Sequence, residues 1–184
     1  IDVAKAVCDR LGINLKLQPI NWDAKEQELN TKNIDCIWNG LTITPERQRN
    51  LLFTKPYMDN RQVLVVRADS GLASLSALSG KKLGLQAGSS AKDALNSAPA
   101  FEATLAAVIE FDENMTALMD LEMGGLDVVL MDEIVARYYI QQRAKNFSVL
   151  NSSRKPWKLW RKTAPWLPFQ SNGLGRTSPS LPNN

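Results

Sequence analysis

The chain has 184 residues, 44% of them hydrophobic, and a formal net charge of +3. This length suits one domain or two small lobes, and through residue 150 the two charge signs are interspersed, which argues against nucleic-acid binding. Histidine is absent and only two cysteines occur, so the commonest general base is missing and neither a metal site nor a cofactor is expected.

The first 33 residues predict a helix, a strand and a second helix. Apolar residues at helical spacing mark a helix within residues 3–11, and Gly12 is placed to end it. The alternation over residues 13–17 predicts a strand that Pro19 closes. A polar helix is expected over residues 23–29.

The next segment, residues 34–57, reads IDCIWNGLTITPERQRNLLFTKPY. The apolar run over residues 34–38 predicts a buried strand, and Thr44 followed by Pro45 predicts the start of a helix. Thr42 and Arg47 therefore cluster where a strand ends and a helix begins. Free backbone N–H groups and a guanidinium at such a place favour an anion site. The alternative is a surface turn whose arginine is solvated.

Helix and strand signals alternate from residue 62 to residue 140, as repeated βαβ units do. Apolar runs predict strands at 62–66, 83–85, 108–111 and 128–131, and helices are expected at 89–95, after 114 and at 133–140. We expect two α/β lobes, with the first over residues 1–67 and the second over residues 68–150.

The segment 34–57 with its FTKPY ending resembles the signature of the extracellular solute-binding proteins of family 3, the amino-acid receptors of bacterial ABC importers. The resemblance runs from Ile1 to about Leu150. It implies the two-lobed α/β fold of type II periplasmic binding proteins, the Venus flytrap, with an incomplete first lobe because the chain opens in mid-pattern. It also implies an extracellular or periplasmic location, where a lipoprotein anchor would fit; the sequence shows no signal region.

The resemblance assigns the carboxylate of a free amino acid to Arg47, whose guanidinium can bind it bidentately. Gly40 and Thr42 match positions that complete this contact. Asp132 follows an apolar strand and matches the family aspartate that accepts from the ligand ammonium; the alternative is an N-cap for the next helix.

Four further residues enter the expected ligand-binding set. Ser89 and Ser90 match a turn that contacts the ligand carboxylate from the second lobe, although helix capping explains one of them equally well. Trp38 and Asn39 would face the ligand side chain, with a core tryptophan as the alternative for Trp38.

Cys8 and Cys36 fall on a predicted helix and on the strand that follows it. A helix packed on a strand would bring them together, and in an exported protein they would form a disulfide. Its loop of about 29 residues would stabilise the fold by about 3 kcal/mol. The alternative is two buried thiols.

Residues 151–184 depart from the family pattern. They contain three tryptophans, repeated prolines and serines, and no sustained period, a composition typical of disorder. If residues 155–184 are back-translated and read in the frame that starts at the third base of the Lys155 codon, synonymous codons can be chosen that spell ALEAMEKDGTVAAISEQWFGQDITKLAE followed by a stop. That is the amphipathic helix and Trp-Phe-Gly ending expected of the family. We therefore expect an aberrant tail, a frameshifted remnant of the C-terminal helix.

These features predict a receptor that closes two lobes around a free amino acid and delivers it to ABC permease subunits, and not an enzyme. One alternative is an enzyme on the same fold, such as a prephenate or arogenate dehydratase, for which Asp132 and Glu133 are the only obvious proton-transfer groups. Another is a truncated product without function. The missing elements also predict a self-associated or swapped oligomer.

Overall fold

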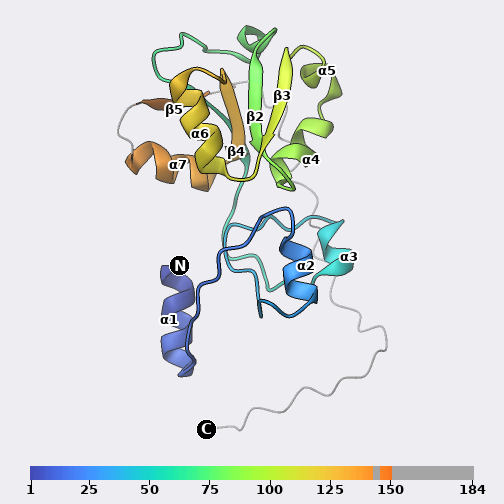
Figure 1. Ribbon diagram of the computed structural model, residues 1–184, viewed down its shortest axis with the longest axis vertical. Helices are drawn as coiled ribbons and strands as arrows, with labels where there is room; N and C mark the ends of the chain where they lie inside the picture. The colour runs from blue at the N-terminus through green and yellow to red at the C-terminus, as the bar shows by residue number, and fades with distance from the viewer. Residues whose placement is uncertain (143–145, 151–184) are drawn as a thin grey trace.

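A computed structural model describes residues 1–142 and 146–150 of the protein. Two lobes follow one another along the chain, and a connecting segment before residue 62 joins them (Figure 1). Within the described ranges no helix is both long enough and apolar enough to cross a membrane. The prediction for the tail, residues 151–184, lies outside these ranges.

The second lobe, described over residues 62–142 and 146–150, lies at the top of Figure 1 and is called the upper lobe; residues 1–61 form the lower lobe. The upper lobe is built on one mixed sheet of five strands in the order β3-β2-β4-β1-β5. Strand β2 pairs in parallel with β3 and β4, whereas β1 pairs antiparallel with β4 and β5. The strands are β1 (Gln62–Arg67), β2 (Lys82–Gln86), β3 (Ala107–Phe111), β4 (Val128–Asp132) and β5 (Phe147–Val149). The four strands expected in this part of the sequence are thus confirmed.

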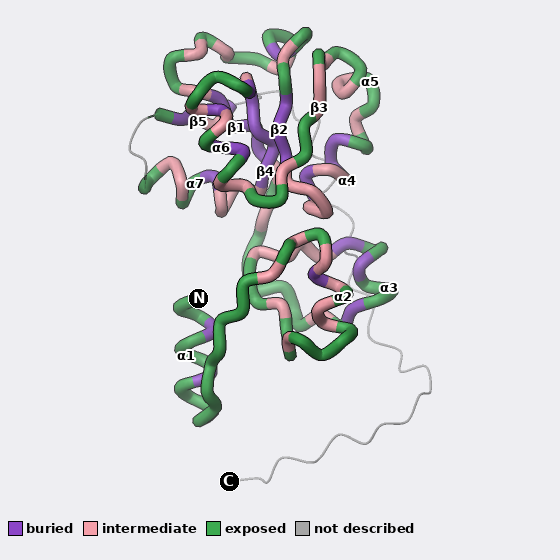
Figure 2. Tube along the Cα trace, in the orientation of Figure 1, coloured by how far each residue is buried: buried purple, intermediate pink, exposed green. Residues whose placement is uncertain are grey.

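Helices cover both faces of this sheet because the central strands are apolar on both sides. Alternate residues of β1 enter different cores: Val63 and Val65 pack with α6 and α7, and Leu64 and Val66 pack with α4. The helices are η1 (Leu75–Leu78), α4 (Ser90–Asn96), α5 (Pro99–Glu102), α6 (Asn114–Met123) and α7 (Glu133–Gln142). The result is a three-layer unit with a hydrophobic core on each side of its sheet, and the central strands are coloured as buried in Figure 2.

The boundary between the lobes needs a correction. It was expected after residue 67, but residues 62–67 form β1, which lies between β4 and β5 in the sheet of the upper lobe. The polar stretch after Arg67 is a turn within that lobe. The chain therefore crosses from one lobe to the other before Gln62.

The lower lobe holds three helices, α1 (Asp2–Leu11), α2 (Lys25–Asn30) and α3 (Arg47–Asn50), and residues 1–61 contain no strand. The strands expected at 13–17 and 34–38 are wrong. A strand needs a neighbour to pair its backbone N–H and C=O groups, and this part of the chain provides none. The lobe is largely exposed, in contrast to the upper one (Figure 2).

Helix α1 forms where it was expected, and Gly12 ends it in a left-handed conformation with φ of 66°. Its apolar stripe is not covered, since Val3 is 57% exposed and Leu11 is 66% exposed. The expected disulfide is wrong for this structure: Cys8 and Cys36 are free thiols, the first buried and the second exposed. The physical reason is that Cys36 lies on an irregular segment instead of a strand packed under α1.

Candidate ligand-binding site

The turn that leads into α3 is fixed by Thr44, a buried residue. Its side-chain oxygen accepts from the backbone N–H of Arg47 at 3.2 Å, and its carbonyl accepts from that of Gln48 at 2.9 Å. Helix α3 begins at Arg47 and not at Pro45. Thr44 nevertheless caps the turn, as the sequence predicts.

The capped turn buries Arg47, which is only 6% exposed. Its Nη1 donates to the carbonyl of Thr42 at 2.9 Å, and its Nη2 donates to the carbonyl of Gly88 at 3.2 Å. Gly88 lies in the turn between β2 and α4, so this second bond joins the two lobes. No acidic side chain of the described chain forms an ion pair with Arg47.

Asp132 ends the central strand β4 and pairs with Gln62, the residue at which the chain enters the sheet from the lower lobe. Its Oδ1 accepts from Asn60 Nδ2 at 2.7 Å and from Gln62 Nε2. Burial raises the pKa of Asp132, and the bonds from Asn60 and Gln62, together with the positive charge of Arg47, act in the opposite direction. The remaining oxygens of the two amides, Asn60 Oδ1 and Gln62 Oε1, are buried without a hydrogen-bond partner.

A chain of hydrogen bonds connects these two halves. Ser90 Oγ donates to Thr42 Oγ1 across the lobes at 3.2 Å, and Gln62 Nε2 donates to Ser90 Oγ at 2.9 Å. Since Arg47 binds the carbonyl of Thr42 and Gln62 binds Asp132, one polar network runs from Arg47 to Asp132. Four residues singled out from the sequence thus meet at the lobe junction.

The other four predicted ligand contacts lie differently. Ser89 donates its hydroxyl to Gln86 O at 2.6 Å within its own lobe. Trp38 is 39% exposed, and the carbonyl of Asn39 accepts from the hydroxyl of Tyr57 at 2.8 Å. A Cβ added at Gly40 would meet no atom within 4 Å, so that position is open. None of these four residues belongs to the network.

Three residues of the junction were missed from the sequence. Asn60 and Gln62 hold Asp132, and Lys25 is buried with its Nζ 2.8 Å from the carbonyl of Gly88. A glutamine at the start of an apolar strand is a weak signal for such a role. Lys25 lies in a polar helix, where a solvated side chain is the ordinary expectation.

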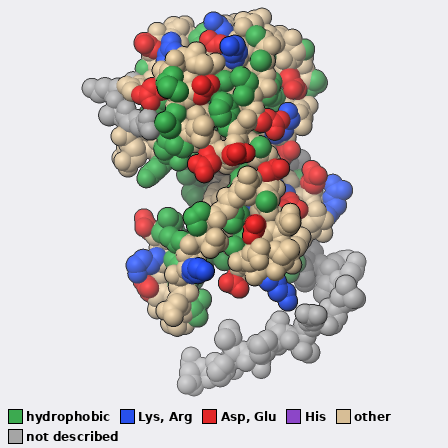
Figure 3. All heavy atoms as spheres, in the orientation of Figure 1, with side chains coloured by type: hydrophobic (Ala, Val, Ile, Leu, Met, Phe, Trp, Pro, Cys, Tyr) green, Lys and Arg blue, Asp and Glu red, His purple; other side chains and the backbone are tan. Residues whose placement is uncertain are grey.

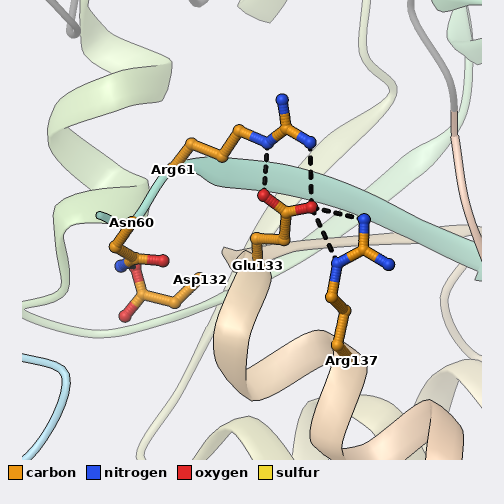
Figure 4. A network of polar contacts seen from close by, with 5 residues as sticks. All are labelled: Asn60, Arg61, Asp132, Glu133 and Arg137. Carbon is orange, nitrogen blue, oxygen red and sulfur yellow. Dashed lines mark hydrogen bonds and ion pairs between the residues drawn. The ribbon is translucent and has the colours of Figure 1, made fainter. Parts of the chain in front are cut away.

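Glu133, the neighbour of Asp132, belongs to a separate ion-pair cluster. Its carboxylate lies between Arg61 and Arg137, whereas Asp132 lies beside Asn60 (Figure 4). The hydrogen bond from Arg61 lowers the pKa of Glu133, and Arg137 adds to this effect. A carboxyl group stabilised in its charged form is a poor proton donor, which counts against its proposed role in a dehydratase.

A pocket of about 550 Å³ has walls from both lobes, and none of the network residues lines it. Trp22 contributes from the lower lobe, and Gln86, Asn114 and Tyr139 contribute from the upper lobe. Acidic side chains gather on this face where the lobes meet (Figure 3), and Asp112 and Glu113 line the pocket. The described ranges hold no group of three or more acidic, cysteine or histidine side chains suited to a metal ion.

Two lobes, one of them a doubly covered α/β sheet, with charged and amide side chains meeting between them, define a two-lobed α/β binding protein. The comparison with protein families makes this specific. The chain belongs to the bacterial extracellular solute-binding proteins, family 3, whose model matches residues 1–163. The predicted family and fold class are confirmed.

Relatives in this family are amino-acid-binding proteins by name. The L-cystine-binding protein TcyJ of Escherichia coli (strain K12) is 29% identical over 138 residues, which are 74% of this chain and 50% of that protein. The L-arginine-binding protein of Pseudomonas aeruginosa is 32% identical over 135 residues, 73% of this chain and 51% of that protein. This chain therefore spans about half the length of these relatives.

Solved structures show the same likeness. An ABC uptake transporter substrate-binding protein from Streptococcus pneumoniae with bound histidine superposes with a TM-score of 0.77 at 35% identity, over 83% of this chain and 64% of that one. An ancestral arginine-binding protein bound to arginine gives 0.71 at 33% identity, over 82% and 66%. These binding proteins give no support to the dehydratase alternative.

Proposed function

We propose that this chain carries the amino-acid site of an ABC-transporter receptor and binds a free L-amino acid between its two lobes. The observation that carries the proposal is the network from Arg47 to Asp132 across the lobe junction. Its ends have opposite charge, as the carboxylate and ammonium of an amino acid require.

At the positive end, Arg47 binds the ligand carboxylate. Both of its present acceptors, the carbonyls of Thr42 and Gly88, are neutral, so a ligand carboxylate would give this buried charge the direct ion pair that the described residues do not give it. Thr42 and Ser90 supply hydroxyl groups from opposite lobes within the same network.

At the negative end, Asp132 binds the ligand ammonium. An ammonium has three N–H donors, and the carboxylate of Asp132 lies beside two amide oxygens, those of Asn60 and Gln62, that lack a partner. A cation with several donors fits this set better than a neutral group does, because the buried carboxylate retains its charge when it is paired.

We place the ligand side chain in the pocket between the lobes, whose volume of about 550 Å³ lies in the range of small-molecule sites. Trp38, Asn39, Gly40 and Ser89 stay predictions as ligand contacts. They lie outside the present network and would join the site when the lobes close around a ligand.

Binding is tested by calorimetric titration of the full chain with L-arginine, L-histidine and L-cystine. Arg47→Ala and Asp132→Ala should each weaken binding at least about 100-fold, because each leaves one ligand charge unpaired. The controls are Arg49→Ala, an exposed arginine of the same helix, and Asp69→Asn, an exposed carboxylate of the upper lobe. Failure of all three amino acids to bind, or unchanged affinity in both site variants, would refute the proposal.

The proposed partners follow from the family. The loaded receptor delivers its ligand to the membrane subunits of an ABC permease on the outer side of the cytoplasmic membrane, which transport assays with reconstituted permease would test. Self-association of this chain stays a prediction, which sedimentation equilibrium tests directly.

A further inference from the structure

Two cations converge on a single oxygen at the lobe junction. Lys25 Nζ lies 2.8 Å from the carbonyl oxygen of Gly88, and Arg47 Nη2 lies 3.2 Å from the same atom. Lys25 comes from α2 and Arg47 from α3, so the lower lobe presents two separate donors to one point of the upper lobe. A second carbonyl, that of Trp22, also accepts from Lys25, at 3.2 Å.

Both cations are buried without a direct ion pair among the described residues. Lys25 is 5% exposed and Arg47 is 6% exposed, and the ion pairs of the described chain include neither. Burial lowers the pKa of Lys25 and the charge of Arg47 lowers it further, whereas Glu26, Asp23 and Asp93 act in the other direction. Two like charges buried against carbonyl oxygens are costly unless an anion joins them.

Resting on the proposed function, we propose that Lys25 is a second binding residue for the ligand carboxylate, which it holds together with Arg47. The carbonyl of Gly88 stands where one carboxylate oxygen would lie. A carboxylate brings a full negative charge and two oxygens with about four lone-pair sites, so it can accept from both side chains at once. The contact between Gly88 and the two cations is then exchanged for a contact through the ligand.

The simpler role for Lys25 is to hold the lobes together without touching the ligand. The two roles differ in how binding depends on the ligand carboxylate. A structural lysine affects an amino acid and its carboxamide equally, because both need the same lobe arrangement. A carboxylate-binding lysine affects only the amino acid.

The experiment is a calorimetric titration of L-histidine and of L-histidinamide into the full chain and its variants. Lys25→Met keeps the length and apolar stem of the side chain and removes the charge. It is expected to weaken histidine binding about 10-fold to 100-fold, the range for a hydrogen bond between charged groups, and to change histidinamide binding less than about 2-fold. Lys25→Arg should restore most of the loss, and Lys92→Met, which removes an upper-lobe lysine paired with Glu110, is the matched control.

The outcomes separate this inference from the proposed function. If Lys25→Met weakens the binding of both ligands equally, or weakens the binding of neither, the proposed role of Lys25 is overturned. The amino-acid site itself still stands in that case if Arg47→Ala abolishes histidine binding. Should wild type bind neither histidine, arginine nor cystine, the proposed function fails and this inference fails with it.

Discussion

Replacing Asp132 by asparagine should make the ligand-free protein more stable while it removes binding. Asp132 Oδ1 accepts from the amide nitrogens of Asn60 and Gln62, and an asparagine oxygen at that place keeps both bonds. The new amide nitrogen is a donor beside two buried oxygens, Asn60 Oδ1 and Gln62 Oε1, that have no partner. The substitution therefore removes a buried charge and offers a partner to an orphaned acceptor.

The expected gain is about 1–2 kcal/mol in the free energy of unfolding. A buried polar atom left without a hydrogen bond costs about 1–3 kcal/mol, and a typical net hydrogen bond contributes about 0.5–1.5 kcal/mol. The gain is one such bond plus relief of the desolvated carboxylate, whose pKa is raised by burial. In a chain of this size about 1 kcal/mol corresponds to a shift of about 2–4 °C in Tm.

The assay is urea unfolding followed by far-UV circular dichroism, for wild type and Asp132→Asn, between pH 3 and pH 8. A carboxyl with a raised folded-state pKa contributes stability that is present at low pH and is lost as the pH rises through that pKa. Wild type and Asp132→Asn should therefore differ most at neutral pH and converge in acid. Asp69→Asn, at an exposed carboxylate of the same lobe, is the matched control. A variant of Asp132 that is less stable than wild type at pH 7 would refute this account of the site.

Three other outcomes follow from the contacts. Gly88→Ala should lower the free energy of unfolding by at least about 1 kcal/mol more than Gly71→Ala does. Both positions have positive φ, but of the two only Gly88 would bring an added Cβ against another residue, with Asp23 Oδ1 at 2.5 Å and Asp23 Cα at 3.1 Å. The difference is measured from the midpoints of urea unfolding. Glu133→Gln should cost about 1 kcal/mol at pH 7, and since the hydrogen bond from Arg61 lowers the pKa of Glu133, this cost should vanish as the pH falls through that depressed pKa, as acid titration of stability would show. Leu118→Ala, at a fully buried position of α6, should cost about 2–5 kcal/mol, whereas Met119→Ala, 46% exposed, should stay within about 0.5 kcal/mol in thermal unfolding.

The upper lobe was predictable from its sequence because its strands pair with other strands, and its helices pack on a sheet, within the same lobe. The apolar runs at 83–85 and 128–131 each find a neighbouring strand in the same lobe, and the intervening helices cover them. Local pattern and tertiary packing agree there, so the pattern is a reliable guide. The boundary failed because the apolar strand 62–67 belongs to the lobe that follows it.

The prediction of strands in the lower lobe failed because an alternation of apolar and polar residues produces a strand only where a neighbouring strand is available for pairing. Residues 13–17 alternate correctly, yet Ile13 and Leu17 are each 55% exposed, since no described strand lies beside them. The disulfide prediction depended on the same missing sheet. At the lobe junction, the family pattern predicts Arg47, Asp132, Thr42 and Ser90, whose role as ligand contacts stays a prediction, whereas the burial of Lys25 depends on contact with Gly88, 63 residues away.

The two lobes therefore depend on each other unequally. The upper lobe has a hydrophobic core on both sides of its sheet, built from its own residues. Three of the six buried residues in the lower lobe are Lys25, Thr44 and Arg47, and two of these donate to Gly88 of the upper lobe. Order in the lower lobe is thus linked to the lobe junction. A ligand that joins Arg47 to Asp132 would stabilise the lower lobe through the same contacts that bind it, so binding and folding of this lobe should be coupled.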